Sequence, residues 1–222
     1  MRFIVVLSLL VLVTTTSANQ QKHTYNVAAN KLIDEIYKGL NAFKSTTRDR
    51  EAVAKAGGAP TYGEILPPAV HQLVKYFKVS DQDVFYDLGS GNGKVPLQFY
   101  ITSPIKKSVG IELSVQRHLQ ALKAKKRLAE KGLIDPQRSL GFLKEDILNA
   151  DFSDATLVYM CSTCYTPKMM RALQEKIENL NKGTKIATLK KFKKSRKLKL
   201  VDNLTLSMTW SKSSSVYIYK VV

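Results

Sequence analysis

Short apolar runs alternate with longer segments of helical length along most of the chain. One apolar strand opens Val84–Gly93, a second lies at Ser108–Leu113 and a third at Ser139–Lys144. Runs of this length are typical of strands buried in a parallel sheet. The alternation continues to Asn181, so it predicts an α/β fold in which helices cover both faces of a doubly wound parallel sheet.

The C-terminal end has a different pattern. Lys185–Phe192, Asn203–Trp210 and Ser215–Val222 are strand-like runs, and no helix-length segment separates the last two. Strands joined by so short a connection pair antiparallel, because a parallel pair needs a crossover. We therefore expect an antiparallel edge on an otherwise parallel sheet.

Residues 1–18 differ from the rest of the chain. Arg2 precedes the apolar run Phe3–Val13, and small polar residues follow up to Ala18. This is the pattern of a secretory signal peptide, which would send the protein into the secretory pathway or out of the cell. The run is shorter than the ~20 residues that span a bilayer, so a permanent N-terminal anchor is the second interpretation. An artefact of the assigned start site is the third.

Residues 19–60 precede the main predicted domain. Apolar residues recur at near-helical spacing over Val27–Ser45 and predict an amphipathic helix. Thr46–Pro60 mixes arginine, alanine and a Gly-Gly pair, and we expect a mobile connector there. The length of 222 residues and the hydrophobic fraction of 44% suit one core, so residues 61–222 are predicted to form one domain.

The first strand of that domain runs into a loop suited to a nucleotide-like ligand. Asp87 precedes three alternating glycines, Gly89, Gly91 and Gly93. Glycine lets a backbone turn tightly and approach a ligand with no Cβ in the way. The spacing differs from the G-x-G-x-x-G pattern of dinucleotide sites. It resembles the first motif of the Rossmann-like methyltransferases, which bind S-adenosylmethionine; the alternative is a purely structural turn.

Two further carboxylates follow the next two strands. Glu112 lies about twenty residues after the glycine loop, the spacing at which an acid meets a ribose in βαβ units. Alternatively, Glu112 is an acid at the N-terminus of a helix that Ser114 caps. Asp146 follows the third strand; it is a candidate acceptor for an adenine amino group, or else a solvated turn residue.

Several motifs together resemble the catalytic domain of the disruptor-of-telomeric-silencing (Dot-one) methyltransferases. They are Thr61-Tyr62-Gly63-Glu64, Tyr86-Asp87-Leu88-Gly89-Ser90-Gly91, Gly110-Ile111-Glu112, Glu145-Asp146-Ile147 and Ser162-Thr163-Cys164-Tyr165. That family methylates a lysine on the nucleosome core without a SET domain. The resemblance runs from about Thr61 to the C-terminus. It implies a Rossmann-like methyltransferase fold with a mostly parallel seven-stranded sheet, and S-adenosylmethionine as the cofactor.

The resemblance implies a role for each matching residue. Tyr62 and Glu64 lie over the methionine part of the cofactor, and Glu112 binds the ribose. Asp146 binds the adenine amino group, with Ile147 against the ring where the family typically has an aromatic residue. The cofactor loop consists of Asp87, Gly89, Ser90, Gly91 and Gly93.

The predicted catalytic residues are Tyr62, Ser162 and Tyr165. After the fourth strand the family has Asn-Asn-Phe-Ala-Phe where this chain has Cys161-Ser162-Thr163-Cys164-Tyr165, so the resemblance places the family's asparagine on Ser162. A lysine acceptor has a reference pKa of ~10.4 and must lose a proton, which an apolar channel favours. Tyr62 and Tyr165 are the expected walls of that channel, and Trp210 is a further candidate.

Cys161 and Cys164 form a C-x-x-C pair. A structural zinc site needs four ligands and the sequence has only these two cysteines, so we expect no metal. A redox pair of the thioredoxin type would open a helix, whereas this pair closes a strand. A disulfide between the two is the alternative if the protein is secreted.

The chain is strongly basic, with a formal net charge of +17. Lys182–Lys199 contains no acidic residue and suits phosphates, an acidic protein surface or anionic lipid headgroups; the alternative is a solvated face that serves solubility. The residues predicted to contact DNA or another polyanion are Lys190, Lys191, Lys193, Lys194, Arg196 and Lys197. A histone or nucleosome is the protein partner that the family resemblance implies.

Three classes of function remain open from the sequence. The first is a histone-type lysine methyltransferase, and the second is a methyltransferase that acts on a small molecule or RNA. The third is a non-catalytic module that retains the cofactor-binding fold. The first class implies a nuclear protein, which conflicts with a secretory signal peptide.

Overall fold

The computed structural model describes residues 18–59 and 61–222. The predicted signal peptide lies outside these residues except for Ala18, and it stays a prediction. Within the described part of the chain, no helix is both long enough and apolar enough to cross a membrane.

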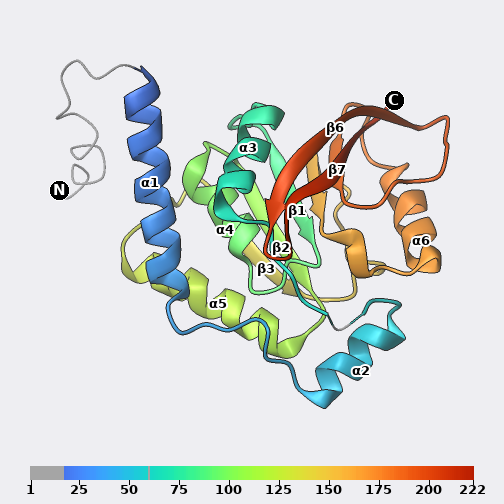
Figure 1. Ribbon diagram of the computed structural model, residues 1–222, viewed down its shortest axis with the longest axis horizontal. Helices are drawn as coiled ribbons and strands as arrows, with labels where there is room; N and C mark the ends of the chain where they lie inside the picture. Colours follow the sequence, from blue (N-terminus) through green and yellow to red (C-terminus); the bar gives the residue numbers. More distant parts are fainter. Residues whose placement is uncertain (1–17, 60) are drawn as a thin grey trace.

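The described residues form one sheet of seven strands (Figure 1). They are β1 (Val84–Leu88), β2 (Lys107–Glu112), β3 (Ser139–Lys144), β4 (Leu157–Met160), β5 (Lys185–Thr188), β6 (Leu198–Met208) and β7 (Ser211–Val221). Their spatial order is β3-β2-β1-β4-β5-β7-β6. Strands β1 to β5 are parallel, and β7 lies antiparallel between β5 and β6. The predicted fold is confirmed, including its antiparallel C-terminal edge.

The strand order reverses at β1, which has β2 on one side and β4 on the other. Ligands of open α/β sheets bind at such a reversal, outside the carboxyl ends of the strands. Strand β1 ends at Leu88, directly before the glycine loop, and β4 ends at Met160, directly before the cysteine pair. The topology therefore brings these two sequence motifs to the same edge of the sheet.

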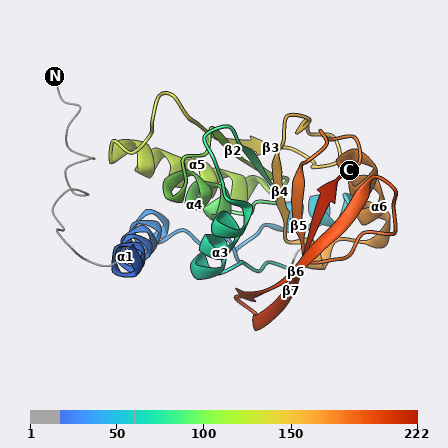
Figure 2. The ribbon, with the colours of Figure 1, turned by 90° about the horizontal axis from the view of Figure 1, so that it is seen from above.

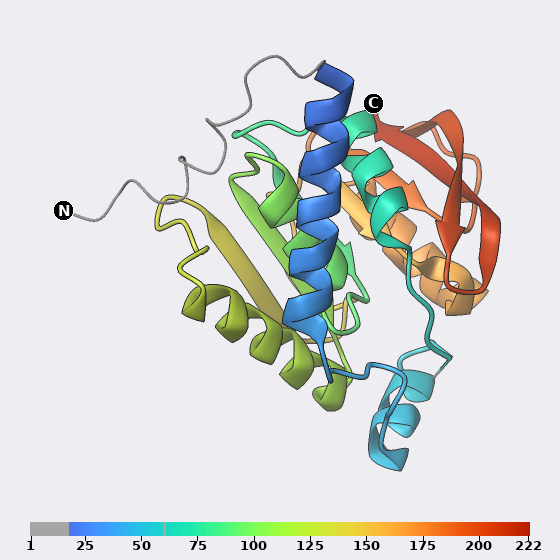
Figure 3. The same cartoon turned by 60° about the vertical axis from the view of Figure 1, so that its left-hand side comes forward.

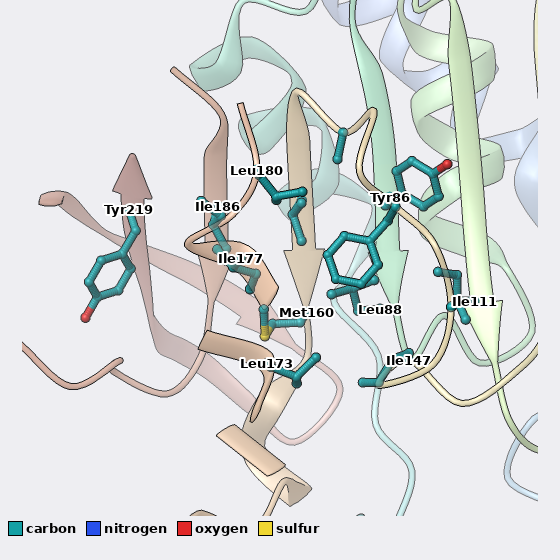
Figure 4. Close-up of a cluster of buried hydrophobic side chains, with 14 of the residues drawn as sticks. Tyr86, Leu88, Ile111, Ile147, Met160, Leu173, Ile177, Leu180, Ile186 and Tyr219 are labelled. Atoms are coloured by element: carbon teal, nitrogen blue, oxygen red, sulfur yellow. The ribbon is translucent and has the colours of Figure 1, made fainter. Parts of the chain in front are cut away.

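Helices cover both faces of the sheet. On one face lie α3 (Pro67–Phe77), α4 (Lys94–Thr102) and α5 (Val115–Glu130), and α1 (Ala18–Tyr37) crosses over α4 and α5 (Figure 3). On the other face lies α6 (Pro167–Ile177), whose Leu173 and Ile177 face the sheet residues Leu88 and Met160 in a buried apolar cluster (Figure 4). The β6–β7 hairpin extends outward at the opposite end of the sheet from β3 (Figure 2).

Helix α1 ends earlier than the sequence predicts. Ile33 and Ile36 are buried, as the apolar spacing predicts, and Tyr37 is buried with them, but the helix stops at Tyr37 instead of continuing to Ser45. Gly39, at φ +76°, turns the chain, and the left-handed region is where glycine commonly follows a helix C-terminus. Phe43, which lies in the predicted helical range, comes after this turn and is 59% exposed.

The predicted connector Thr46–Pro60 contains a helix, α2 (Thr47–Lys55), so the expectation of an irregular segment was wrong. Thr46 caps it by accepting a hydrogen bond from Asp49 N. The buried Asp49 carboxylate in turn accepts from Val115 N at 2.9 Å and Gln116 N at 3.4 Å. Because these are the first residues of α5, Asp49 satisfies the free N–H groups and the positive end of the dipole of a distant helix.

The strands at the C-terminal end have shifted bounds. Strand β5 stops at Thr188 instead of Phe192, and β6 begins at Leu198, before the predicted Asn203. Phe192 is buried against Tyr219, with ring centroids 5.0 Å apart. This anchor holds the lysine-rich loop 189–197 between the two strands.

We expect Asp49→Ala to lower the free energy of unfolding by about 1 kcal/mol, the usual effect of losing a helix N-terminal cap. Urea unfolding followed by circular dichroism measures the change. Glu51→Ala, which removes an exposed acid from the same helix, is the control. Equal stability of the two variants would mean that Asp49 does not anchor α2 to α5.

Candidate active site

A cavity opens at the carboxyl edge of the sheet, where the sequence motifs meet. It spans about 730 Å³, open solvent at its mouth included. A second cavity of about 340 Å³ adjoins it and shares Tyr62, Gly63, Gly89 and Cys161 as lining residues. Of the predicted site residues, the first cavity is also lined by Glu112, Asp146, Ile147 and Tyr165, and the second by Glu64, Asp87 and Ser90.

The glycine loop between β1 and α4 has the conformation that its sequence indicates. Gly89, Gly91 and Gly93 have φ angles of +84°, +57° and +81°, which side chains disfavour. The amides of Gly89 and Ser90 both donate to Ile111 O at 2.9 Å, so the loop folds back over β2. Gly93 lies outside both cavities; it precedes α4, and a Cβ there would meet Phe142.

Two tyrosines lie directly against the glycine loop. A Cβ on Gly91 would clash with the Tyr62 ring, and a Cβ on Gly89 would clash with the Tyr165 hydroxyl. Tyr165 donates to Leu88 O at 2.6 Å. The glycines therefore serve both the backbone turn and the close approach of the two predicted channel walls.

Glu112 joins the glycine loop to the start of α5. Its Oε2 accepts from Gly91 N and its Oε1 from Ser114 N, both at 2.8 Å. Ser114 Oγ caps α5 by accepting from Arg117 N, so the alternative interpretation of Glu112 is correct about the cap. Burial raises the pKa of Glu112, although the Ser114 amide and the Arg117 charge oppose the rise. Its carboxylate lines the first cavity with acceptor lone pairs to spare.

Asp87 is a buried carboxylate in the second cavity, 2% exposed. Its Oδ1 has no hydrogen-bond partner within the described residues. Burial, followed by the negative charge of Glu112, raises its pKa well above the ordinary value. A buried acceptor without a donor is costly, so this atom fits a ligand that brings a hydrogen-bond donor or a positive charge.

The Tyr62–Glu64 segment covers the loop and is held in place by several contacts. Tyr62 donates to Glu64 Oε1 at 2.8 Å and to Asn92 Oδ1 at 3.3 Å. The Lys94 ammonium lies 2.5 Å from Glu64 Oε2, and the Arg117 guanidinium lies 4.5 Å from the centre of the Tyr62 ring. These contacts orient the aromatic ring over Gly91.

Trp210 packs on Gly63, where a Cβ would collide with the indole ring. Thr209 N, beside it, donates to Glu64 O at 2.8 Å. The β6–β7 hairpin thus holds the Tyr62–Glu64 segment from outside. The indole is 47% exposed and lines neither cavity.

Ser162, a predicted catalytic residue, does not line either cavity. It is fully buried, and its Oγ lies 2.8 Å from Thr188 Oγ1 and accepts from Lys190 N at 2.8 Å. The preceding residue, Cys161, lines both cavities instead. Ser162, which the resemblance places at the family's asparagine, therefore lies between two residues that line the first cavity, Cys161 and Thr163.

Asp146 and Ile147 lie together after β3 and line the first cavity. Asp146 Oδ1 accepts from Leu148 N at 2.9 Å, which closes a tight turn. Ile147 is 5% exposed and packs into the cluster around α6. Asp146, Ile147 and Glu112 therefore line the same cavity.

Three residues that line the first cavity were missed from the sequence. Arg117 is one of them; it is 6% exposed although it is charged. Val53 and Ala59 belong to the segment that was predicted to be a mobile connector. That segment is pinned by backbone hydrogen bonds, Ala59 N to Cys164 O and Thr166 N to Gly57 O, each of 3.0 Å.

Cys161 and Cys164 are free thiols. Burial raises the pKa of Cys161 to about 12, which keeps it protonated and weakly nucleophilic at neutral pH. No cluster of His, Cys, Asp and Glu suited to a metal ion occurs within residues 18–59 and 61–222.

Comparisons with known proteins agree with this geometry. The sequence model of the family described as "Histone methylation protein DOT1" matches residues 49–220, which begins inside α2 and earlier than the predicted start at residue 61. A Drosophila melanogaster protein named "Histone-lysine N-methyltransferase, H3 lysine-79 specific" is 28% identical over 145 residues. These cover 59% of this chain but 7% of that protein.

A second relative is of more similar length. The "Protein-lysine N-methyltransferase" of Saccharolobus islandicus is 29% identical over 119 residues, which cover 54% of this chain and 69% of that one. Among solved structures, an RNA methyltransferase from Salinibacter ruber in complex with S-adenosyl-L-homocysteine superposes with a TM-score of 0.52 at 23% identity. That superposition covers 69% of this chain and 90% of the other, and it agrees with the fold. The predicted signal peptide gains no support from any of these matches.

The raised pKa of Asp87 predicts how stability depends on pH. An acid whose pKa is higher in the folded state favours folding only while protonated, so its contribution is lost as pH rises above 3.8, its ordinary value. We therefore expect Asp87→Asn to unfold at higher urea concentration than the parent at pH 7, with a smaller advantage at pH 5. Asp81→Asn, at an exposed turn, controls for the lost charge. An advantage that does not grow with pH would contradict the assignment.

Proposed function

We propose a function from one premise: the chain belongs to the DOT1 histone methylation family. The protein is an S-adenosylmethionine-dependent protein-lysine N-methyltransferase. The observation that carries this conclusion is the placement of two buried carboxylates, Asp87 and Glu112, beside a glycine loop at the switch point of the sheet.

The cavity residues suit the parts of S-adenosylmethionine one by one. Glu112 binds the ribose hydroxyls, because its oxygens retain acceptor capacity on the wall of the cavity. Asp146 accepts from the adenine amino group, and Ile147 packs on the ring. Asp87, with its unpartnered Oδ1, takes the positively charged amino-acid end, while Tyr62 and Glu64 cover it. The sulfonium of the bound cofactor supplies the methyl group.

The protein favours transfer by positioning the acceptor and by excluding water. Tyr62 and Tyr165 form the walls of the acceptor channel, and burial raises the pKa of each phenol well above its ordinary value. Both therefore stay neutral, and an aromatic channel of this kind lowers the pKa of an entering lysine by desolvation. Cys161 and Thr163 occupy the cavity wall beside them, on either side of Ser162, the residue that the resemblance places at the family's asparagine.

A histone within a nucleosome is the substrate that we propose. The relatives whose names specify histone H3 support it, although the chain spans 7% of the Drosophila protein. The name of the Saccharolobus islandicus relative specifies lysine in a protein but mentions no histone. A chromatin substrate implies a nuclear protein. The secretory alternative depends on the predicted leader.

We expect the protein to transfer labelled methyl groups from S-adenosylmethionine to lysine in nucleosomes. Gly91→Val should abolish transfer, because the side chain would displace Tyr62 and strain a backbone at φ +57°. Gly132→Val is a matched control, since Gly132 has φ +70° but no atom within 4 Å of its Cβ position; it should stay active. Scintillation counting and peptide mass spectrometry measure the product.

Each other outcome of that assay identifies a different function. Label in RNA or in a small molecule alone would replace the lysine activity with another methyltransferase activity. Binding of the cofactor without transfer to any substrate would indicate a non-catalytic module. A parent protein that does not bind the cofactor would overturn the proposal altogether.

The lysine-rich loop 189–197 supports a polyanionic partner. Lys191, Lys193, Lys194, Arg196 and Lys197 are exposed, and none forms a salt bridge with a carboxylate of the described chain. Lys190 differs from them, because its ammonium donates to Tyr165 O at 2.7 Å. A surface hollow lined by Lys190, Lys191, Lys193 and Tyr165 places the loop next to the active site.

We expect replacement of Lys193, Lys194, Arg196 and Lys197 by alanine to weaken binding to nucleosomal DNA. The slope of log K against log salt should fall by roughly 0.9 for each lost phosphate contact. Fluorescence anisotropy over a salt series measures it. Replacing the exposed, scattered Lys31, Lys75, Lys123 and Lys126 removes the same charge and should leave a steeper slope. If the two variants have equal slopes, the loop serves solubility and does not bind DNA.

A further inference from the structure

The second cavity contains a polar atom that the proposed function does not yet use. Tyr159 lines it, and its hydroxyl is buried with no hydrogen-bond partner of good geometry within the described residues. Its polar neighbour is the thiol of Cys161, and sulfur is a weak acceptor. Two further unpartnered atoms belong to residues that line the same cavity: Asp87 Oδ1, discussed above, and Ser90 Oγ.

Tyr159 and Asp87 are placed side by side by the sheet. They are register partners on the parallel strands β4 and β1, so their side chains project from the same face. Tyr159 is 2% exposed, like Asp87. The strands therefore aim one carboxylate and one phenol at the same cavity.

The lack of a partner sets Tyr159 apart from the other buried tyrosines around the site. Tyr37 donates to Asn92 O, Tyr62 to Glu64 and Tyr165 to Leu88 O. Buried phenols nearly always find such a partner. Phenylalanine at position 159 would fill the same space without the cost of an unpaired hydroxyl, so the hydroxyl is explained best by a ligand.

We infer that the Tyr159 hydroxyl and the Asp87 carboxylate together receive one ammonium group, the α-ammonium of the cofactor's amino-acid end. This inference rests on the proposed function. An ammonium has three donors and needs acceptors. Asp87 Oδ1 supplies one and the Tyr159 oxygen a second, while the phenol proton remains free to point at Cys161.

The charges around the cavity favour a cation at this point. The nearby Lys94 is engaged by Glu64 at 2.5 Å, so it does not neutralise Asp87 through a direct contact. Burial keeps the phenol of Tyr159 protonated, since its pKa lies well above the ordinary value. The phenol therefore acts as a neutral acceptor beside the carboxylate and adds no second negative charge.

The test compares two ligands by isothermal titration calorimetry. S-adenosylhomocysteine carries the α-ammonium, and 5′-methylthioadenosine lacks the amino-acid part. We expect Tyr159→Phe to weaken S-adenosylhomocysteine binding about tenfold, which corresponds to about 1.4 kcal/mol, and to leave 5′-methylthioadenosine binding unchanged. The ligand-free variant should unfold at the same or a higher temperature than the parent, because the removed hydroxyl has no partner.

Tyr86→Phe is the matched control. The Tyr86 hydroxyl donates to Asp154 Oδ1 and accepts from Lys107 Nζ, both at 2.8 Å, on the opposite face of the sheet. Its loss should lower the unfolding temperature and leave both affinities unchanged. We thus expect Tyr159→Phe to bind S-adenosylhomocysteine more weakly without losing stability. We expect Tyr86→Phe to lose stability without binding more weakly.

Three results would overturn the inference. If Tyr159→Phe binds S-adenosylhomocysteine as the parent does, the hydroxyl has no binding role, while the methyltransferase proposal stands. If the variant loses affinity for both ligands equally, the ring has moved and the ammonium contact is wrong. If the parent binds neither ligand, the proposed function fails first.

Discussion

The architecture of the site depends on the two hydrogen bonds that the Glu112 carboxylate accepts from Gly91 N and Ser114 N. They connect the loop after β1 to the turn after β2, although these segments are separated along the chain by helix α4. The first bond holds the loop in a conformation that only glycine adopts readily, and the second aligns the start of α5. Arg117, one turn into α5, is thereby placed over the Tyr62 ring.

This arrangement concentrates negative charge in a buried region. Burial raises the pKa of Asp87 and the charge of Glu112 raises it further, whereas Arg117 opposes the rise in the pKa of Glu112. Within the described residues, no lysine or arginine forms a salt bridge with Asp87. The ligand-free fold is therefore less stable than a core of the same size with neutral residues, and a cationic ligand would recover that free energy on binding.

The sequence was sufficient for features that depend on local pattern. Three such features are the glycine spacing, the acid after β2 and the short C-terminal connection. The positive φ angles of the loop agree with the glycine spacing, and the order of the strands agrees with the short connection. Helix α2 was missed because its stabilising contact is between Asp49 and a helix far along the chain, which no local pattern contains. The burial of Ser162 away from both cavities was not visible in the sequence for a similar reason: its hydroxyl is bound by Thr188 and Lys190, residues of the next strand and loop.

The contacts of Ser162 also connect two parts of the molecule that the sequence presents as separate. Lys190 donates its amide to Ser162 Oγ and its ammonium to Tyr165 O, so the lysine-rich loop and the aromatic wall of the cavity share one hydrogen-bonded anchor. Phe192 fixes the same loop to the core through Tyr219. A polyanion bound by the exposed lysines would thus be held at a fixed position relative to Tyr165. For a substrate that carries its acceptor lysine near phosphate groups, the basic loop then contributes to orienting the acceptor as well as to affinity.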